Sequence, residues 1–250
     1  MERPGARILI CLTTRGKRDM AAALNIVHQW EKQKGPAEAL SLSISLAAAE
    51  VGEQVKPILD FATDQEKHEA WFSVQCEFLY FLFHVVRRIA LNKLGDEKRG
   101  FIHNRVVPLT IKSFIDARFN FLPDEDQEAL QGELEEADLT AELAYSNCTE
   151  VIAWEALQKE LVQSTLIIEY DTYAKDRGLR PYSEMDPFDL SPEVMDARQP
   201  KYLFAVLGMR LTKSVGEWNS KRFVDLSLMA YGIYKATDLD RLVLDLGAVI

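Results

Sequence analysis

The chain has few of the residues on which stapled or loop-rich folds depend. Its three cysteines, Cys11, Cys76 and Cys148, form neither a Cys-x-x-Cys pair nor a cluster with histidine. This number and spacing indicate neither a disulfide framework nor a zinc knuckle, and they favour a reducing, cytoplasmic location. With 12 glycines and 9 prolines in 250 residues, the chain is also too poor in turn residues for a loop-rich β-sandwich or a disordered protein.

Long apolar runs and an excess of positive charge are lacking as well. The longest apolar run, near residue 80, is interrupted by His84, Arg87 and Arg88. It is well short of the roughly 20 residues that cross a bilayer. The formal net charge of −10 disfavours nucleic acids and anionic membranes as partners, because both are held mainly by Lys and Arg. We therefore expect a soluble, acidic protein with no nucleic-acid and no membrane partner.

Motifs of the common enzyme classes are missing. The sequence contains no Gly-x-Ser-x-Gly, no glycine-rich phosphate loop, no His-Glu-x-x-His and no paired Asp-rich motif. Acid and base groups can also be assembled from single residues on separate helices, so whether the protein is an enzyme stays open at this point. No catalytic residue is assigned.

What the sequence does contain is one helical pattern after another. Helices are predicted over about 21–33, 36–62, 64–94, 97–121, 125–147, 149–177, 201–217 and 219–235; the stretches 125–147 and 149–177 are either two helices or one long one. The clearest helix begins at the capping-box sequence Thr63 to Glu66, "TDQE", and ends at Gly95. Gly52 and Pro57 are expected to bend the helix over 36–62, and Pro108 the helix over 97–121. Because no stretch alternates like a β-strand, we predict an all-α fold, a single compact bundle of about seven helices.

The chain divides into a short leader and one domain. Residues 1–19 are basic and are expected to be a disordered leader; a transit segment, or translation starting at Met20, are the alternatives. Residues 20–250 are predicted to form a single helical domain, with a main bundle over 36–177 and helices of 201–250 packed on it. The segment 178–200 holds four prolines and is predicted to be a long loop.

The most unusual stretch is "CEFLYFLFHVVRR", Cys76 to Arg88, in which Glu77 and His84 interrupt a run of apolar residues. On a helix, polar residues here fall on one narrow stripe: Ser73, Glu77, Tyr80, His84, Arg88 and Asn92. The other faces are apolar nearly all round, so this helix is predicted to be the central one of the bundle and its stripe to be at least partly buried.

Two interpretations of this polar stripe are open. In the first it belongs to an internal hydrogen-bond network, with Arg88 as charge partner and with polar groups of other helices opposite it. The candidates are His103, Asn104, Tyr145, Ser146, Thr149, Glu169, Asp171 and Tyr173. In the second it forms a ligand site, with Glu77, Tyr80, His84, Arg88 and Glu169 as the binding residues.

Metal and cofactor sites have little support in the sequence. The chain has no Glu-x-x-His motif, as a di-iron bundle requires, and a lone histidine among aromatic residues is more typical of a core than of a haem site. Residues 124–135 carry acids at calcium-loop positions but have Ala129 where that loop needs glycine. No cofactor and no metal ligand is therefore assigned.

Charge is strongly segregated along the sequence. Residues 119–158 contain no Lys or Arg but many acids, whereas 85–100 and 208–222 are basic. An acidic block of this kind is typical of a solvated helix face, and it is also able to dock a basic partner or a second copy of the chain. The leading hypothesis is a non-enzymatic protein-interaction module that binds a protein partner or self-associates as a dimer. The alternative is a small-ligand or metal-binding bundle with a buried Glu/His stripe.

Overall fold

A computed structural model describes residues 25–59, 61–146, 148, 203–216 and 220–250. Within these residues the secondary structure is helical, with no strand, and the helices pack into a bundle. The predicted all-α fold is therefore confirmed. The leader 1–19, the predicted helix 149–177, the loop 178–200 and Glu169 lie outside the described residues, and the division into a main bundle and a C-terminal part stays a prediction.

The first described helices show how glycine and proline shape this chain. Residues 25–34 are helical, and α2 (Pro36–Val55) follows across Gly35, whose φ of 108° suits glycine. The predicted disturbance at Pro57 takes the form of a helix end, because α2 gives way to a 3-10 turn, η1 (Lys56–Ile58). Gly52 stays inside α2, where a Cβ atom would lie 2.7 Å from Gln75 Cγ. Its small size therefore permits close packing against the next helix.

The long helix α3 (Asp64–Leu94) has the bounds that the sequence predicts. The backbone N–H of Glu66 donates to Thr63 Oγ1 at 3.2 Å, and the backbone N–H of Thr63 donates to Glu66 Oε2 at 2.9 Å, which completes the capping box. At the other end Gly95, with φ 90°, terminates the helix. Both ends are thus set by local sequence.

The remaining helices are α4 (Asp96–Phe119), α5 (Asp124–Ser146), α8 (Leu203–Val215), α9 (Ser220–Lys235) and α10 (Leu239–Ala248). Pro108 lies inside α4. The last helix, α10, packs on α2 and α3, and Lys98 Nζ donates to the Gly247 carbonyl at 2.6 Å. A hydrogen bond of 3.0 Å from Ser43 Oγ to the Thr237 carbonyl joins α2 to the connection between α9 and α10.

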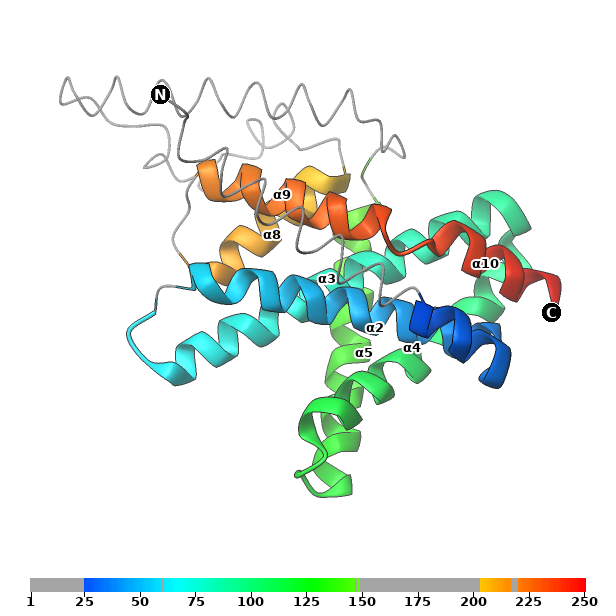
Figure 1. Cartoon of the computed structure of the whole chain (residues 1–250), viewed down its shortest axis with the longest axis horizontal. Coiled ribbons are helices and arrows are strands. Elements are labelled where there is room, and N and C mark those ends of the chain that lie inside the picture. Colours follow the sequence, from blue (N-terminus) through cyan, green and yellow to red (C-terminus); the bar gives the residue numbers. More distant parts are fainter. Residues whose placement is uncertain (1–24, 60, 147, 149–202, 217–219) are drawn as a thin grey trace.

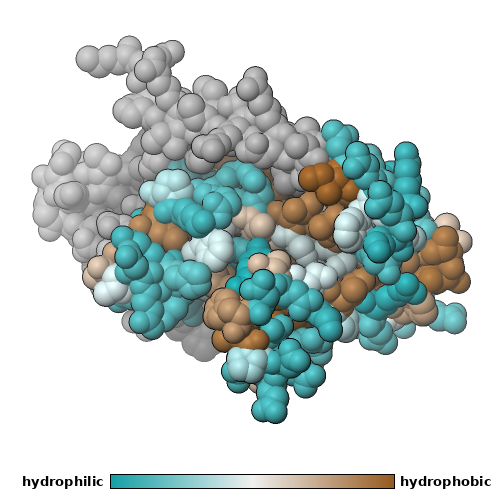
Figure 2. Space-filling view, turned by 60° about the horizontal axis from the view of Figure 1, so that its bottom comes forward, coloured by the Kyte–Doolittle hydropathy of each residue, from teal (hydrophilic) through white to brown (hydrophobic). Residues whose placement is uncertain are grey.

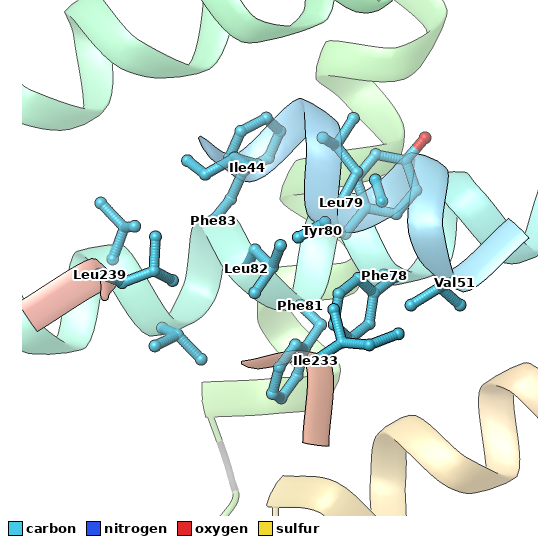
Figure 3. Close-up of a cluster of buried hydrophobic side chains, with 14 of the residues drawn as sticks. Ile44, Val51, Phe78, Leu79, Tyr80, Phe81, Leu82, Phe83, Ile233 and Leu239 are labelled. Carbon is cyan, nitrogen blue, oxygen red and sulfur yellow. The ribbon is translucent and has the colours of Figure 1, made fainter. Parts of the chain in front are cut away.

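The helix α3 is the centre of the bundle, as predicted. It contacts α2, α4, α5, α8 and α10, while α5 crosses the long direction of the molecule (Figure 1). Side chains of α3 between Phe78 and Phe83 meet Ile44 and Val51 of α2, Ile233 of α9 and Leu239 of α10 (Figure 3). Because α3 is apolar nearly all round, the few polar groups that it carries are forced against neighbouring helices.

The outer surface is mixed. Hydrophilic side chains predominate on the face shown in Figure 2, with separate apolar patches between them. Of the described helices, none combines the length and the apolar character that a membrane span requires.

Candidate functional site

Glu77 of the predicted stripe meets an arginine that lies far away in the sequence. Arg210 of α8 donates to it through two nitrogen atoms, with Nε 2.5 Å from Oε2 and Nη2 3.0 Å from Oε1. Burial lowers the pKa of Arg210, but the hydrogen bond and charge of Glu77 outweigh this effect and raise the pKa overall. Glu77 is therefore one half of a bidentate ion pair between α3 and α8.

His84, also on the stripe, belongs to a larger polar group that we name the core polar cluster. It comprises His84 and Arg87 of α3, His103 of α4, and Asp138 and Glu142 of α5. His84 Nδ1 lies 2.9 Å from Glu142 Oε2, and Arg87 Nη1 donates to the same oxygen at 2.8 Å. The cluster thus ties three helices together at the point where they cross.

Arg87 is the centre of the core polar cluster. It is only 8% exposed, and its guanidinium donates through Nη1 and Nη2 to the two carboxylate oxygens of Asp138, which is 1% exposed. Its Nε donates to His103 Nδ1 at 3.0 Å. The acids of α5 are thus paired with Arg87, and the charge-partner role of its neighbour Arg88 stays a prediction.

The pKa values of the titratable groups in the cluster are shifted in different directions. Burial raises the pKa of Glu142, but the hydrogen bond and charge of His84 and the charge of Arg87 outweigh burial, so the pKa is lowered. Burial raises the pKa of Asp138 despite Arg87. For His103, burial and then the charge of Arg87 lower the pKa, which agrees with its neutral ring accepting a hydrogen bond at Nδ1. At neutral pH each member thus has a charge or hydrogen-bond partner inside the cluster.

Arg88 and Tyr80, the other described residues of the predicted ligand site, lie in different surroundings. Arg88 Nη2 lies 3.5 Å from the Ser146 carbonyl, and Arg88 lines a pocket of about 160 Å³ that His84, Asn92, Cys148 and Tyr234 also line. We name it the His84 pocket. Tyr80 is buried, and burial, followed by the charges of Cys76 and Glu77, raises its pKa. The structure therefore brings His84 and Arg88 to one pocket, but Glu77 and Tyr80 do not line it.

Metal binding has no support in the described part of the chain. There, no group of three or more His, Cys, Asp or Glu side chains is arranged to hold an ion. The core polar cluster pairs its carboxylates with Arg87, a cation that repels metals.

The helix α5 has a second polar surface, which faces outward. Its exposed residues Glu133, Glu136, Leu139, Thr140 and Leu143 recur every three or four positions, and we name them the outer face of α5. Leu139 is 60% exposed and Leu143 is 70% exposed. Neither Glu133 nor Glu136 belongs to an ion pair among the described residues. The acidic block therefore splits into an inward pair, Asp138 and Glu142, and an outward face with acids and leucines.

Sequence reasoning missed Arg87, Asp138, Glu142 and Arg210. One signal was present, because Asp138 and Glu142 are four residues apart on the face that also carries the apolar Leu134, Ala141 and Tyr145. Acids at core-facing positions indicate a buried cation opposite.

Comparison of the chain with protein-family models, with curated proteins and with solved structures finds no match.

Proposed function

We propose that the protein is a non-enzymatic helical module that binds a protein partner through the outer face of α5. The observation that carries this proposal is the exposure of Leu139 and Leu143, four residues apart on the helix, beside carboxylates that have no described ion-pair partner. Exposed leucines in single positions are ordinary, but two in helical register next to a pair of acids match the surface that an amphipathic helix recognises.

The chemistry of this face defines the partner. Leu139 and Leu143 offer apolar contact, while Glu133 and Glu136 favour Lys or Arg beside it. The partner that fits is a basic amphipathic helix with leucine-like residues on one face.

A separate protein is a better candidate for this partner than a second copy of the same chain. The basic stretches 85–100 and 208–222 are the natural cation sources of this chain, but Arg87 is buried on Asp138 and Arg210 is held by Glu77. Lys98 is bound to the Gly247 carbonyl. Fewer cations are thus left to form a contact between copies.

The test is a titration of the full chain with a labelled Leu/Lys amphipathic helix peptide, followed by fluorescence anisotropy. We expect saturable 1:1 binding that weakens with salt, no binding of a matched Leu/Glu peptide, and at least about fivefold weaker binding in Leu139→Ser. Leu244→Ser is the control, because Leu244 is 42% exposed on α10. Equal binding by both variants would rule out the outer face of α5 as the docking surface.

Sedimentation velocity of the free protein distinguishes binding of a separate protein from self-association of this chain. A monomer at low and high salt agrees with a separate partner. A salt-sensitive dimer that Leu139→Ser dissociates and Leu244→Ser does not would assign the same face to self-association.

The second candidate function is small-ligand binding at the polar stripe, and the His84 pocket is the observation that favours it. Its lining by His84, Arg88 and Asn92 suits a small polar molecule. Native mass spectrometry of the purified protein tests this candidate. If the protein binds a ligand at this pocket, the native mass exceeds the mass of the chain, and the excess disappears in His84→Leu. A native mass equal to that of the chain alone counts against ligand binding.

A further inference from the structure

A larger cavity lies on another side of the molecule, independent of the outer face of α5. It is a groove of about 610 Å³ along the contact between α2 and α4, and we name it the α2/α4 groove. On α2 it extends from Glu38 to Glu53, a length of about 22 Å at 1.5 Å per residue. This size is typical of sites for small organic molecules.

The groove has an apolar wall. Leu42 and Leu46 of α2 face Leu109 of α4 across it. Small side chains at Ser45 and Ala49 leave the space that larger residues would fill. The shape and lining therefore suit an elongated hydrocarbon chain.

Two buried polar atoms at this groove have no hydrogen-bond partner in the structure. They are Ser45 Oγ and Trp71 Nε1, and both residues line the groove. An indole N–H is only a donor, so Trp71 calls for an acceptor. Because buried donors in native proteins are nearly always paired, the packing of the helices behind this wall of the groove is incompletely satisfied.

The same end of the groove carries a cation without a carboxylate partner. Arg118 Nε and Nη2 donate to Gln75 Oε1 at 2.9 and 2.5 Å, and Nη1 donates to the Phe114 carbonyl at 3.2 Å. These bonds use three of the five N–H groups of a guanidinium. None of the ion pairs of the described residues includes Arg118. Burial lowers its pKa, and the charges of Cys76 and Glu53 raise it by less than burial lowers it. An anion beside Arg118 would relieve the unmatched charge.

The remaining charges make the two ends of the groove electrostatically different. Lys56 lies 4.7 Å from the centre of the Trp71 ring and pairs with Glu53 at 2.6 Å, so with Arg118 this end has a net positive charge. Glu38 lies toward the other end, with Arg105 at 3.8 Å. One anionic head at the Trp71 end is therefore favoured, and a second at the Glu38 end is not.

We propose that the α2/α4 groove binds a long-chain carboxylic acid, whose carboxylate accepts from Arg118 and whose hydrocarbon chain lies along Leu46, Leu42 and Leu109. A peptide fits less well, because the groove wall offers few partners for the backbone N–H and C=O groups that it would bury.

The experiment is a titration of the full chain with 11-(dansylamino)undecanoic acid, whose emission rises in an apolar site, followed by displacement with palmitate. We expect one saturable site per chain that palmitate empties. The methyl ester of palmitic acid should displace the probe about tenfold less well, because it lacks the charge that Arg118 recognises.

Two variants locate the site. Arg118→Gln should weaken binding of the acid about tenfold and leave the affinity for the methyl ester unchanged, with Arg99→Gln as the control on the same helix. Ala49→Leu should abolish binding by filling the groove, with Ala129→Leu on α5 as the size control. Thermal unfolding of each variant shows whether the fold is retained, and Ala49→Leu keeps the test valid if Arg118→Gln does not fold.

Three results would overturn the proposal: no saturable probe signal, equal affinity for acid and ester, or unchanged binding in Ala49→Leu. None of them affects the outer face of α5, since Leu139 lies on a different helix from Arg118 and Ala49.

Discussion

The core polar cluster and the α2/α4 groove contain similar polar groups, but these groups are paired with one another in the cluster and are incompletely paired in the groove. In the cluster, Arg87 has acceptors from two helices, and the acids that it contacts lie within hydrogen-bond distance. In the groove, Arg118 has no carboxylate partner, and the buried Trp71 Nε1 and Ser45 Oγ have no partner at all. A closed network indicates a role in holding helices together, whereas unpaired buried groups beside a cavity indicate a site.

The largest expected effect breaks the closed network. Arg87→Met would leave Asp138 and Glu142 without their main cation, and we expect a loss of about 3–5 kcal/mol in the free energy of unfolding, measured with urea. Arg105→Met is the control, because that side chain is 50% exposed and pairs with Glu38 at 3.8 Å, and it should cost under about 1 kcal/mol. Similar losses in the two variants would show that Arg87 is not the centre of the cluster.

A smaller effect concerns pH. Because the pKa of His103 is lowered on folding, the unfolded chain binds this proton more readily. The associated stability is present above the ordinary value of 6.5 and is lost as the pH falls below it through the lowered folded pKa. The lowered pKa of Glu142 adds a further loss only below its ordinary value of 4.5.

His103→Asn should remove the upper part of this pH dependence, since an amide oxygen can accept from Arg87 Nε but does not titrate. The measurement is the free energy of unfolding against pH from neutral to acid. The charged groups facing His103 are Arg87, Glu142, Arg99 and Glu135. An unchanged profile in His103→Asn would assign the acid sensitivity to another group.

The smallest expected effect compares two hydroxyls on α2. Ser43 Oγ donates to the Thr237 carbonyl at 3.0 Å, while Ser45 Oγ, two residues on, is buried at the groove without a partner. Ser43→Ala should lose about 1 kcal/mol, and Ser45→Ala should be neutral or slightly stabilising. The midpoint of urea unfolding gives both values. A loss on Ser45→Ala as large as that on Ser43→Ala would show that Ser45 is paired after all.

Local signals in the sequence predicted the framework well. The capping box at Thr63 and the glycine at 95 set the bounds of α3, and its nearly uniform apolar character set its central place. These features depend on residues a few positions apart, so a single sequence contains them.

Pairings between helices were beyond the sequence. Glu77 and Arg210 are 133 residues apart, and nothing local relates them. Arg87 and Arg88 differ by one helical step of about 100°, and a helix that is apolar on most sides does not indicate which of them faces the acids of α5. Trp71 Nε1 and Ser45 Oγ lack hydrogen-bond partners because of the way α2, α3 and α4 pack together. The sequence contains no signal for this packing.

The contact of α10 with α2 has a consequence for how the chain is made. The surface of α2 and α3 that Ile233 and Leu239 cover is closed by residues far downstream in the sequence, through contacts such as that from Ser43 to Thr237, 194 positions apart. A ribosome releases those residues well after α2 and α3. In that interval the nascent protein exposes Phe81, Leu82 and their neighbours, an apolar surface prone to aggregation during translation.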